Sequence, residues 1–500
     1  MILVAARVAQ LSRWVQLGLA VLCGAIGALA HAPFGFAPAI MIPLAAGFVL
    51  LQAATTVRSA FRNGWGLGFG YFALTLTWIT EPFQVDAATT GWMAPFALVL
   101  LGLLLGVFWG GALAFSRWAE GSVIALVVAW SSAELLRAYL FTGFPWAAPP
   151  QVLVDAWAGQ GLAWLGPHGL MLAMVCSVAA LISLPKAGVG FAAIATLALS
   201  LLIPASSDDS PLTAHTIRLV QPNAPQDEKW DADKIPIFVN RQIDYTAAPG
   251  DPDLILWPET ALPYLVDTAQ PAFDVIAEAA RGTPVVLGIQ RRDDTAYFNS
   301  LVVLDAAGQV TQTYDKHHLV PFGEYMPAAW LFRRINVGGL AMRAQGGYSA
   351  GPGPQVLDFG DLGTALPLIC YEAVFAHDVG NTPSRPAFLM QLTNDAWFGA
   401  RSGPQQHLAQ ARMRAIEQGL PMVRAANTGI SAMIDPKGRV TASLALNTAG
   451  YLDAALPEPS AVTVYARTGD MPWVAFLFVG MITLVLRRAI LRRAVGIDAP

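Results

Sequence analysis

The sequence predicts a multi-span α-helical membrane domain joined to a layered α/β domain that lies in water. The chain is 55% hydrophobic and 13% charged, with a mean hydropathy of +0.49, which is too apolar for a water-soluble protein of this length. Residues 1–204 carry seven Lys and Arg and five Asp and Glu, whereas residues 205–465 carry eighteen and twenty-seven. We therefore expect a membrane domain at 1–204, an α/β domain at 205–465, and a final membrane helix with a basic tail at 466–500.

Eight apolar runs have roughly the length that crosses ~30 Å of hydrocarbon as a helix. Turn residues separate them, such as His31 to Gly35 and Pro185 to Gly188. The expected spans, seven of them before the α/β domain, lie at about 15–31, 37–55, 64–80, 91–115, 122–141, 161–184, 187–204 and 472–486.

Basic residues orient these spans, because Lys and Arg are enriched in cytoplasmic loops. Apart from Arg137, near the outer end of the fifth span, the basic residues around the expected spans fall on one side: Arg7, Arg13, Arg58, Arg62, Arg117, Lys186, Arg487, Arg488, Arg492 and Arg493. Both termini are therefore expected in the cytoplasm, and residues 205–465 on the outer side. The N-terminal run that ends at 28–32 also imitates a cleavable signal peptide, but the loop after it is too short and apolar to begin an exported domain.

In residues 205–465 the apolar runs are shorter, and they alternate with helical segments and Gly-, Pro- and Asn-rich turns. Helical stretches lie at about 271–281 and 404–418. This alternation predicts buried strands in a layered α/β domain. The expected strands include 217–220, 254–257, 284–289, 300–304, 366–370, 387–392 and 422–426.

Three polar residues follow strand-like runs in this domain: Glu259, Lys316 and Cys370. Cys370 has no expected disulfide partner, because Cys23 and Cys176 lie in apolar segments. A carboxylate can take a thiol proton while the sulfur attacks a carbonyl carbon, and an ammonium with the backbone N–H after the cysteine can hold the oxyanion. The set suits acyl transfer if the fold brings it together. Taken alone, each residue also has a structural reading: a packing thiol, a loop carboxylate and a solvated charge.

Longer motifs around these residues resemble the nitrilase, or carbon–nitrogen hydrolase, superfamily. Trp257-Pro258-Glu259 and Cys370-Tyr371-Glu372 carry the likeness, and the segments Phe141–Trp146, Lys316–Pro327 and Thr393–Phe398 extend it. Together with the spans they resemble the membrane-bound apolipoprotein N-acyltransferase family of Gram-negative bacteria, over both parts of the chain. The resemblance implies a nitrilase-like αββα sandwich and a multi-pass location in the bacterial inner membrane, with the catalytic domain in the periplasm.

The resemblance also implies a two-step, ping-pong acyl transfer. Cys370 takes an acyl chain from a phospholipid, with phosphatidylethanolamine as the expected donor, and forms a thioester. The N-terminal amine of the diacylglyceryl-cysteine of an apolipoprotein then accepts the chain, which completes lipoprotein maturation. By position in the family motifs, Glu259 is the general base and Lys316 the cation that stabilises the oxyanion. Glu324 matches a second carboxylate, which orients Lys316 or assists proton movement.

Further residues are expected to support the nucleophile or to contact substrate. Tyr371 and Glu372 are expected to support Cys370, and Trp230 to contact substrate, although it also suits an interface or core aromatic. The expected substrate and lipid contacts are Trp230, Arg137, Trp146, Trp330, Asn394 and Trp397.

Glu134 and Arg137 are three residues apart in the fifth expected span and so share a helix face, where unpaired charges are costly. Either they form an intrahelical pair, or Arg137 contacts a lipid phosphate; the family motif at 141–146 favours the second. The chain after Trp146 departs from the family's usual Gly-Tyr pair, which leaves the local lipid contacts open. In residues 328–350, Trp330 and other apolar residues lie beside arginines, which suits the headgroup boundary. We hypothesise a mobile lid there; a loop packed on its own domain is the alternative.

We expect no metal, cofactor or nucleic acid. His215, His317 and His318 lack ligand-like company, and adjacent residues on an extended segment point to opposite faces. The chain has no glycine loop that would cradle the phosphates of ATP or CoA. Two other classes compete. A tethered soluble-type amidase would need one span, and a transporter would not need the thiol, so eight spans with charges inside the membrane favour an enzyme that acts on a bilayer substrate.

Overall fold

The structure is a computed structural model of the 500-residue chain and describes residues 2–184, 186–205, 209–327 and 347–494. The described chain divides into two compact units. Unit 1 contains residues 1–207, 401–409 and 463–500, and unit 2 contains residues 208–400 and 410–462. Residues 401–409 therefore group with the helical unit, which the sequence pattern did not indicate.

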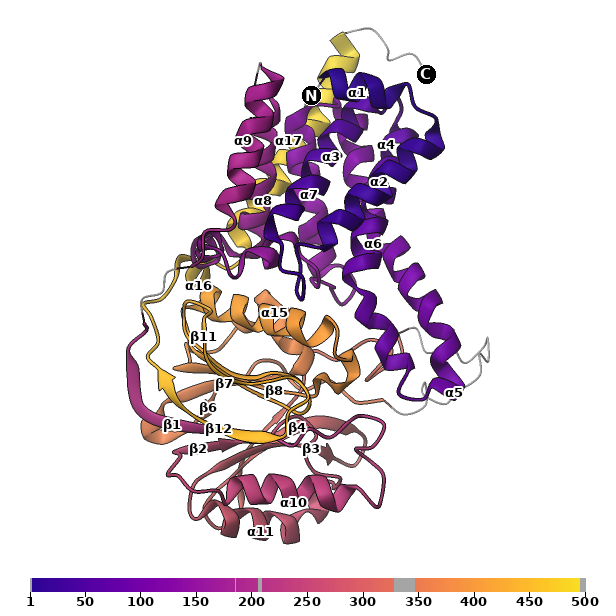
Figure 1. The fold of residues 1–500 in the computed structure, drawn as a ribbon. Coiled ribbons are helices and arrows are strands. Elements are labelled where there is room, and N and C mark those ends of the chain that lie inside the picture. The colour runs from indigo at the N-terminus through magenta and orange to yellow at the C-terminus, as the bar shows by residue number, and fades with distance from the viewer. Residues whose placement is uncertain (1, 185, 206–208, 328–346, 495–500) are drawn as a thin grey trace. The chain divides into compact units, whose positions relative to one another are not determined.

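Unit 1 is helical, and each expected span falls on a helix (Figure 1). The helices are α1 (Ile2–Ala9), α2 (Arg13–Ala28), α3 (Met41–Ala53), α4 (Val57–Thr75), α5 (Ala87–Thr90), α6 (Ala94–Ala119), α7 (Val123–Tyr139), α8 (Leu162–Ile182), α9 (Ala187–Ser200), α16 (Val464–Thr468) and α17 (Met471–Ala494). Within the described residues, three stretches are long and apolar enough to cross a membrane: Ala87–Ala119, Trp157–Ile182 and Met471–Arg493. Shorter apolar helices lie at Arg13–Ala28, Ala37–Ala53 and Gly188–Ser200.

Glycines let helices α2, α4 and α6 pack closely. A Cβ added at Gly106 of α6 would lie 2.9 Å from the Trp65 carbonyl oxygen and 3.0 Å from the Phe69 nitrogen, both on α4. A Cβ added at Gly70 of α4 would lie 2.0 Å from the Val21 carbonyl oxygen on α2. Small residues are the usual means by which membrane helices approach each other, so this packing fits a membrane domain.

Unit 2 contains two six-stranded sheets in its described residues, ordered β12-β1-β2-β3-β4-β5 and β11-β10-β9-β8-β7-β6. Strands β1, β2 and β3 are mutually parallel, as are β7, β8 and β9, and the other neighbours are antiparallel. The strands are β1 (Leu212–Gln221), β2 (Leu254–Leu256), β3 (Val285–Arg292), β4 (Tyr297–Leu304), β5 (Val310–Asp315), β6 (Leu357–Asp358), β7 (Thr364–Ile369), β8 (Phe388–Thr393), β9 (Met422–Ala426), β10 (Ser431–Ile434), β11 (Val440–Leu444) and β12 (Gly450–Pro457).

Helices cover the outer faces of the two sheets (Figure 1). Helices α10 (Ile235–Thr246) and α11 (Gln270–Ala280) cover the first sheet, where Phe273 and Ile276 pack on Trp257 and Leu287 in a buried apolar cluster. The part of helix α15 (Gly403–Gln418) that belongs to unit 2 lies over the second sheet, and the short α14 (Ala376–Gly380) follows the turn after β7. The layered α/β domain expected from the sequence is confirmed.

Candidate active site

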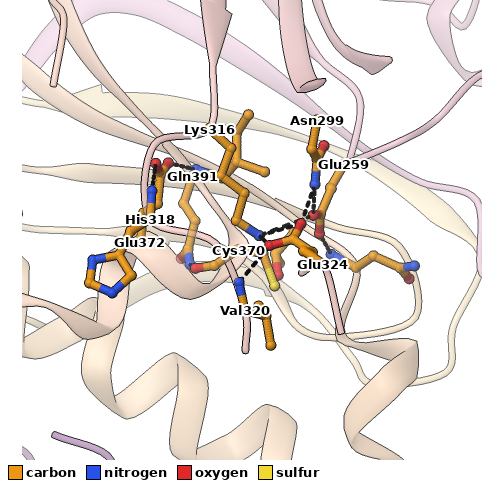
Figure 2. Close-up of polar contacts among 12 residues, drawn as sticks. Glu259, Asn299, Lys316, His318, Val320, Glu324, Cys370, Glu372 and Gln391 are labelled. Carbon is orange, nitrogen blue, oxygen red and sulfur yellow. Dashed lines mark hydrogen bonds and ion pairs between the residues drawn. The ribbon is translucent and has the colours of Figure 1, made fainter. Parts of the chain in front are cut away.

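The ends of three strands bring the expected site residues together (Figure 2). Glu259 follows β2, Lys316 follows β5 and Cys370 follows β7. Their exposed fractions are 7%, 1% and 5%, so a charged group here meets protein more than water. Lys316 Nζ lies 3.7 Å from Glu259 Oε1, and both groups act electrostatically on the Cys370 thiol. The carboxylate, the ammonium and the thiol thus share one buried site.

Glu324 is the closest partner of Lys316. The Lys316 ammonium lies 2.9 Å from each carboxylate oxygen of Glu324, and Glu324 Oε2 also accepts a 2.8 Å bond from the Val320 N–H. Burial lowers the pKa of Lys316, but Glu324 and Glu259 outweigh burial and raise it above its usual range. Lys316 therefore stays charged. The contacts of Glu324 with the Lys316 ammonium are those that would orient the lysine side chain.

Asn299 on β4 bridges the two carboxylates, and sequence reasoning missed it. Its Nδ2 donates to Glu259 Oε1 at 2.7 Å and to Glu324 Oε1 at 2.8 Å, and its backbone oxygen accepts the Lys316 N–H at 2.9 Å. Bonds to ionised acceptors are the stronger class. A single asparagine in a strand carries no distinctive sequence signal. The position two residues before the strand's apolar run could have suggested a strand-end polar group and nothing more.

Glu259 is held on its other side by the turn after β8. The Asn394 N–H donates to Glu259 Oε2 at 2.8 Å. The Asn394 side chain donates to Gln226 Oε1 at 2.7 Å and accepts a 2.8 Å bond from Asn427. Asn394, which the sequence placed at the substrate, therefore contacts Glu259 through its backbone, and its amide is engaged with protein.

A glycine on the neighbouring strand makes room for the Glu259 turn. A Cβ added at Gly288 of β3 would lie 2.4 Å from the Thr260 nitrogen and 2.6 Å from Glu259 Cα. Below 3.0 Å the backbone would have to move. The place of Glu259 thus depends on the absence of a side chain at Gly288.

Lys229 adds a second buried amine beneath this turn. Its Nζ donates to the Glu259 carbonyl oxygen at 3.3 Å. Burial lowers the pKa of Lys229 to about 8, although Glu259 opposes this effect. The Lys229 amine therefore carries its charge less firmly than Lys316 does, and its contact is to the backbone of Glu259.

Cys370 stands in a strained turn with φ of +52°, a region that disfavours side chains with a Cβ. Burial raises the pKa of its thiol well above the usual range; Glu259 adds to the rise, and Lys316 opposes it. The thiol is therefore neutral at rest, and any reaction of its sulfur as a nucleophile would require loss of that proton. A carboxylate beside it is the group such a transfer needs.

Glu372 connects the Cys370 turn to the Lys316 segment. Its Oε2 accepts the Ile369 N–H at 2.7 Å, and its Oε1 accepts the His317 N–H at 2.8 Å and the Tyr314 hydroxyl at 2.8 Å. Figure 2 shows Glu372 between these segments. The fully buried carboxylate therefore fixes one strand end against the other.

The expectation that His317 and His318 point to opposite faces was wrong. Asp378 Oδ2 lies 2.7 Å from His318 Nδ1 and 3.7 Å from His317 Nε2, because the chain bends after β5 instead of staying extended. Burial lowers the pKa of His317, but Asp378 and Glu372 outweigh burial and raise it to about 9. Among the described residues, no group of three or more His, Cys, Asp and Glu has the arrangement of a metal site.

Two families match this chain. The family described as Carbon-nitrogen hydrolase matches residues 203–464, and the one described as Apolipoprotein N-acyltransferase N-terminal domain matches residues 23–181. The apolipoprotein N-acyltransferase of Rhodopseudomonas palustris is 37% identical over 95% of this chain and 96% of its own length. The one from Caulobacter vibrioides is 36% identical over 93% of each. The chain belongs to the apolipoprotein N-acyltransferase family.

Among solved structures, an amidase from Nesterenkonia sp. is similar at 18% identity, with a TM-score of 0.37, over 54% of this chain and 99% of the amidase.

The aromatic residues that the sequence assigned to substrate contact or to support of Cys370 differ in their exposure to solvent. Trp230 and Trp397 are 43% and 40% exposed, so both remain accessible to a ligand. Tyr371 is buried, with its ring edge-on to Phe375 at 4.9 Å between centroids. Trp330 and most of the expected lid lie outside the described residues.

In unit 1, Arg137 is buried and pairs with Glu134 at 2.6 Å. Its Nη1 donates to the carbonyl oxygens of Phe144 and Trp146, and the Trp109 indole donates to Glu134 at 2.8 Å. These contacts use Nη1 and Nη2 of the guanidinium, so the packing favours the intrahelical pair over a lipid phosphate.

Trp146 is also buried, and its indole donates to Gln406 Oε1 at 2.8 Å. Its ring stacks on His407 at 5.5 Å between centroids. Gln406 also donates to the carbonyl oxygens of Ala32 and Thr75. Trp146 therefore packs inside unit 1, and the short segment 401–409 is tied to the helices by these bonds.

Proposed function

We propose that this protein transfers an acyl chain from a membrane phospholipid, through a thioester on Cys370, to the N-terminal amine of diacylglyceryl-cysteine in apolipoproteins. The observation that carries the proposal is the cluster of buried Glu259 and Lys316 with partly buried Glu324 around a neutral thiol. It lies in a chain whose relatives over nearly the whole length are named apolipoprotein N-acyltransferase. We assign Glu259 as general base, Lys316 as the cation at the oxyanion and Cys370 as nucleophile.

In the first half-reaction the Cys370 sulfur attacks the ester carbonyl of the phospholipid while Glu259 takes the thiol proton. The Lys316 ammonium and the N–H of the peptide after Cys370 stabilise the oxyanion of the tetrahedral intermediate. When the intermediate collapses, the C–O bond of the glycerol ester breaks, and Glu259 returns the proton to the leaving oxygen. The products are an acyl thioester on Cys370 and a lysophospholipid.

In the second half-reaction the α-amine of the acceptor attacks the thioester carbonyl. Glu259 takes a proton from the attacking nitrogen, because an amide product requires its loss. The C–S bond breaks, and the Cys370 sulfur recovers a proton from Glu259. The same carboxylate thus serves both halves, and the site returns to its starting charge.

Glu324, Tyr371 and Glu372 act as supporting residues in this proposal. The bonds of Glu324 to Lys316 and of Glu372 to the segments around Cys370 support those roles. Trp230 and Trp397 are the accessible candidates for substrate contact. The packing of Arg137, Trp146 and Asn394 against protein supports a positioning role for each.

The donor in this proposal is phosphatidylethanolamine, and the chain crosses the inner membrane eight times. Residues 1–204 form seven spans, residues 205–465 the periplasmic catalytic domain, and residues 466–500 the eighth span with a cytoplasmic tail. The one-sided distribution of Lys and Arg and the helices at each expected span support this topology.

Mass spectrometry after incubation with phosphatidylethanolamine vesicles tests the chemistry. We expect an acyl adduct on Cys370 that is absent from Cys370→Ser and disappears when a diacylglyceryl-cysteine peptide is added, with the chain recovered as an amide. A wild-type protein that forms no adduct would contradict the proposal. Release of free fatty acid without an acceptor would instead assign the site to hydrolysis.

A further inference from the structure

The carbonyl group of the nucleophilic cysteine is held by a side chain from the neighbouring strand. Gln391 on β8 donates from Nε2 to the Cys370 oxygen at 3.0 Å, and Figure 2 shows its amide beside the Cys370 turn. The left-handed backbone of Cys370 is unfavourable for a residue other than glycine. Contacts around the turn have to maintain it, and the Gln391 bond is one of them.

A buried ion pair fixes which way round the Gln391 amide lies. Arg424 donates from Nη1 to Gln391 Oε1 and from Nη2 to Asp395 Oδ2 at 2.5 Å, while its Nε donates to the Ile430 oxygen at 3.1 Å. Arginine only donates, so Gln391 has to turn its oxygen to Arg424 and its NH₂ to Cys370.

The side chains of this network are fully buried. The exposed fractions of Gln391, Arg424 and Asp395 are all 0%. Burying an ion pair is costly and is weak evidence of a stabilising role. A satisfied network does, however, hold its members in one arrangement. The bond to the Cys370 oxygen is one point at which this network contacts the site, and Asp395 also acts electrostatically on the Cys370 thiol.

The peptide bond carries this constraint into the site. The oxygen of Cys370 and the N–H of Tyr371 belong to one planar trans peptide, in which they point in opposite directions. Fixing the oxygen therefore fixes the direction of the N–H. A bond to the carbonyl also polarises the peptide and strengthens its N–H as a donor.

We propose that Gln391, locked by Arg424 and Asp395, is a positioning residue that aims the Tyr371 N–H at the oxyanion formed during acyl transfer. The inference rests on the proposed function, because it assumes that Cys370 attacks a carbonyl group. It adds to Glu259 and Lys316 a second, buried polar network that contacts the nucleophile through its backbone.

Two reactions of Cys370 separate this role from a structural one. Acylation by phospholipid passes through an oxyanion, whereas alkylation by iodoacetamide displaces iodide and forms none. In Gln391→Met, the donor is lost without a new charge, and we expect the ratio of the acylation rate to the alkylation rate to fall about 30-fold or more. Dividing by the alkylation rate removes any change in the reactivity of the thiol itself.

Gln221→Met on β1 is the matched control. Gln221 is also fully buried and donates to the backbone oxygens of Ala445 and Thr448, so its loss reports the cost of removing a buried amide elsewhere. We expect its ratio to equal that of the wild type. If Gln391→Met does not fold, Gln391→Asn, whose shorter side chain draws the amide away from the Cys370 oxygen without adding a charge, gives the same reading.

The inference is overturned if the ratio in the Gln391 variant equals that of the wild type or of Gln221→Met. It is also overturned if both rates fall in proportion, because the glutamine would then merely place the thiol. Failure of the proposed function looks different: the wild-type protein would be alkylated normally and would gain no acyl adduct.

Discussion

The neutral side chain of Asn299 donates to two carboxylates, the buried Glu259 and the partly buried Glu324. Without its NH₂ group, Glu259 and Glu324 would each lose a donor and would face each other across the Lys316 ammonium. A hydrogen bond to a charged group contributes about 1.5–3 kcal/mol. We therefore expect Asn299→Leu to slow acylation of Cys370 by about 10- to 100-fold, measured by mass spectrometry of the adduct.

Ser300→Ala is the control for Asn299→Leu, since Ser300 is the next residue on β4 and donates instead to Asp315 at 2.6 Å. It should destabilise the fold slightly and leave acylation close to the wild-type rate. Equal losses in the two variants would mean that the strand, and not the bridging amide, matters.

The raised pKa of the Cys370 thiol predicts how the alkylation rate of this residue depends on pH. Burial raises its pKa, Glu259 raises it further, and Lys316 opposes the rise. Free cysteine alkylates with a midpoint near its pKa of about 8.5. Alkylation of Cys370 by iodoacetamide without lipid should therefore be slower than that of free cysteine and still increase with pH above about 9.

Lys316→Met should make this alkylation slower at every pH, because the cation that favours the thiolate is gone. The measurement is the second-order rate constant between about pH 6 and 10. A plateau at or below the pH at which free cysteine levels off would contradict the expected rise in pKa.

Helices α4 and α6 supply the clearest prediction among the elements. A side chain at Gly106 would meet the backbone of α4 within 3.0 Å, whereas a Cβ at Gly111, also on α6, would meet no atom of the described residues within 4 Å. Overpacking of this kind typically costs about 1–3 kcal/mol. Gly106→Val should lower the midpoint of thermal unfolding in detergent by several degrees, and Gly111→Val should leave it nearly unchanged. Similar shifts in both would argue against close α4–α6 packing.

The elements were predictable because their signals are local. Apolar runs placed the helices of unit 1 and the buried strands of unit 2, and strand ends marked Glu259, Lys316 and Cys370. The roles of Asn299, Gly288 and Gln391 were not predicted, because they depend on which strands become neighbours in the folded sheets. The bend after β5 that brings His317 and His318 to one carboxylate was missed for a similar reason: an extended run of residues gives no sign of where it turns.

At the scale of the whole molecule, the proposed topology can be tested by labelling. In a background with Cys23, Cys176 and Cys370 replaced by Ser, we expect Ser384→Cys in unit 2 to react with a membrane-impermeant maleimide in intact cells whose outer membrane has been opened. Thr55→Cys, between α3 and α4, should react after the inner membrane is broken. Both positions are exposed in the structure, so burial does not explain a difference. Early labelling of Thr55→Cys would contradict cytoplasmic placement of that loop.

The order of residues along the chain did not indicate that residues 401–409 belong to the helical unit 1. They follow the motif at 393–398 and include the first residues of α15, so their place in the sequence assigns them to the α/β domain. Four hydrogen bonds from or to Gln406, reaching Ala32, Thr75, Trp146 and Gln151, place them in unit 1. Such a segment is recognisable from contacts and not from composition.

The residue at the position of Gly288 can be compared among the relatives of this protein to judge whether their site is intact. A gene copy that keeps the glutamate, the lysine and the cysteine looks intact when those residues alone are inspected. A side chain at the position of Gly288 would displace the glutamate turn, so such a copy would lose the position of the proposed base while it retained every reactive group. We therefore expect a glycine at this position in working members of the family and a larger residue only in copies that no longer transfer acyl chains.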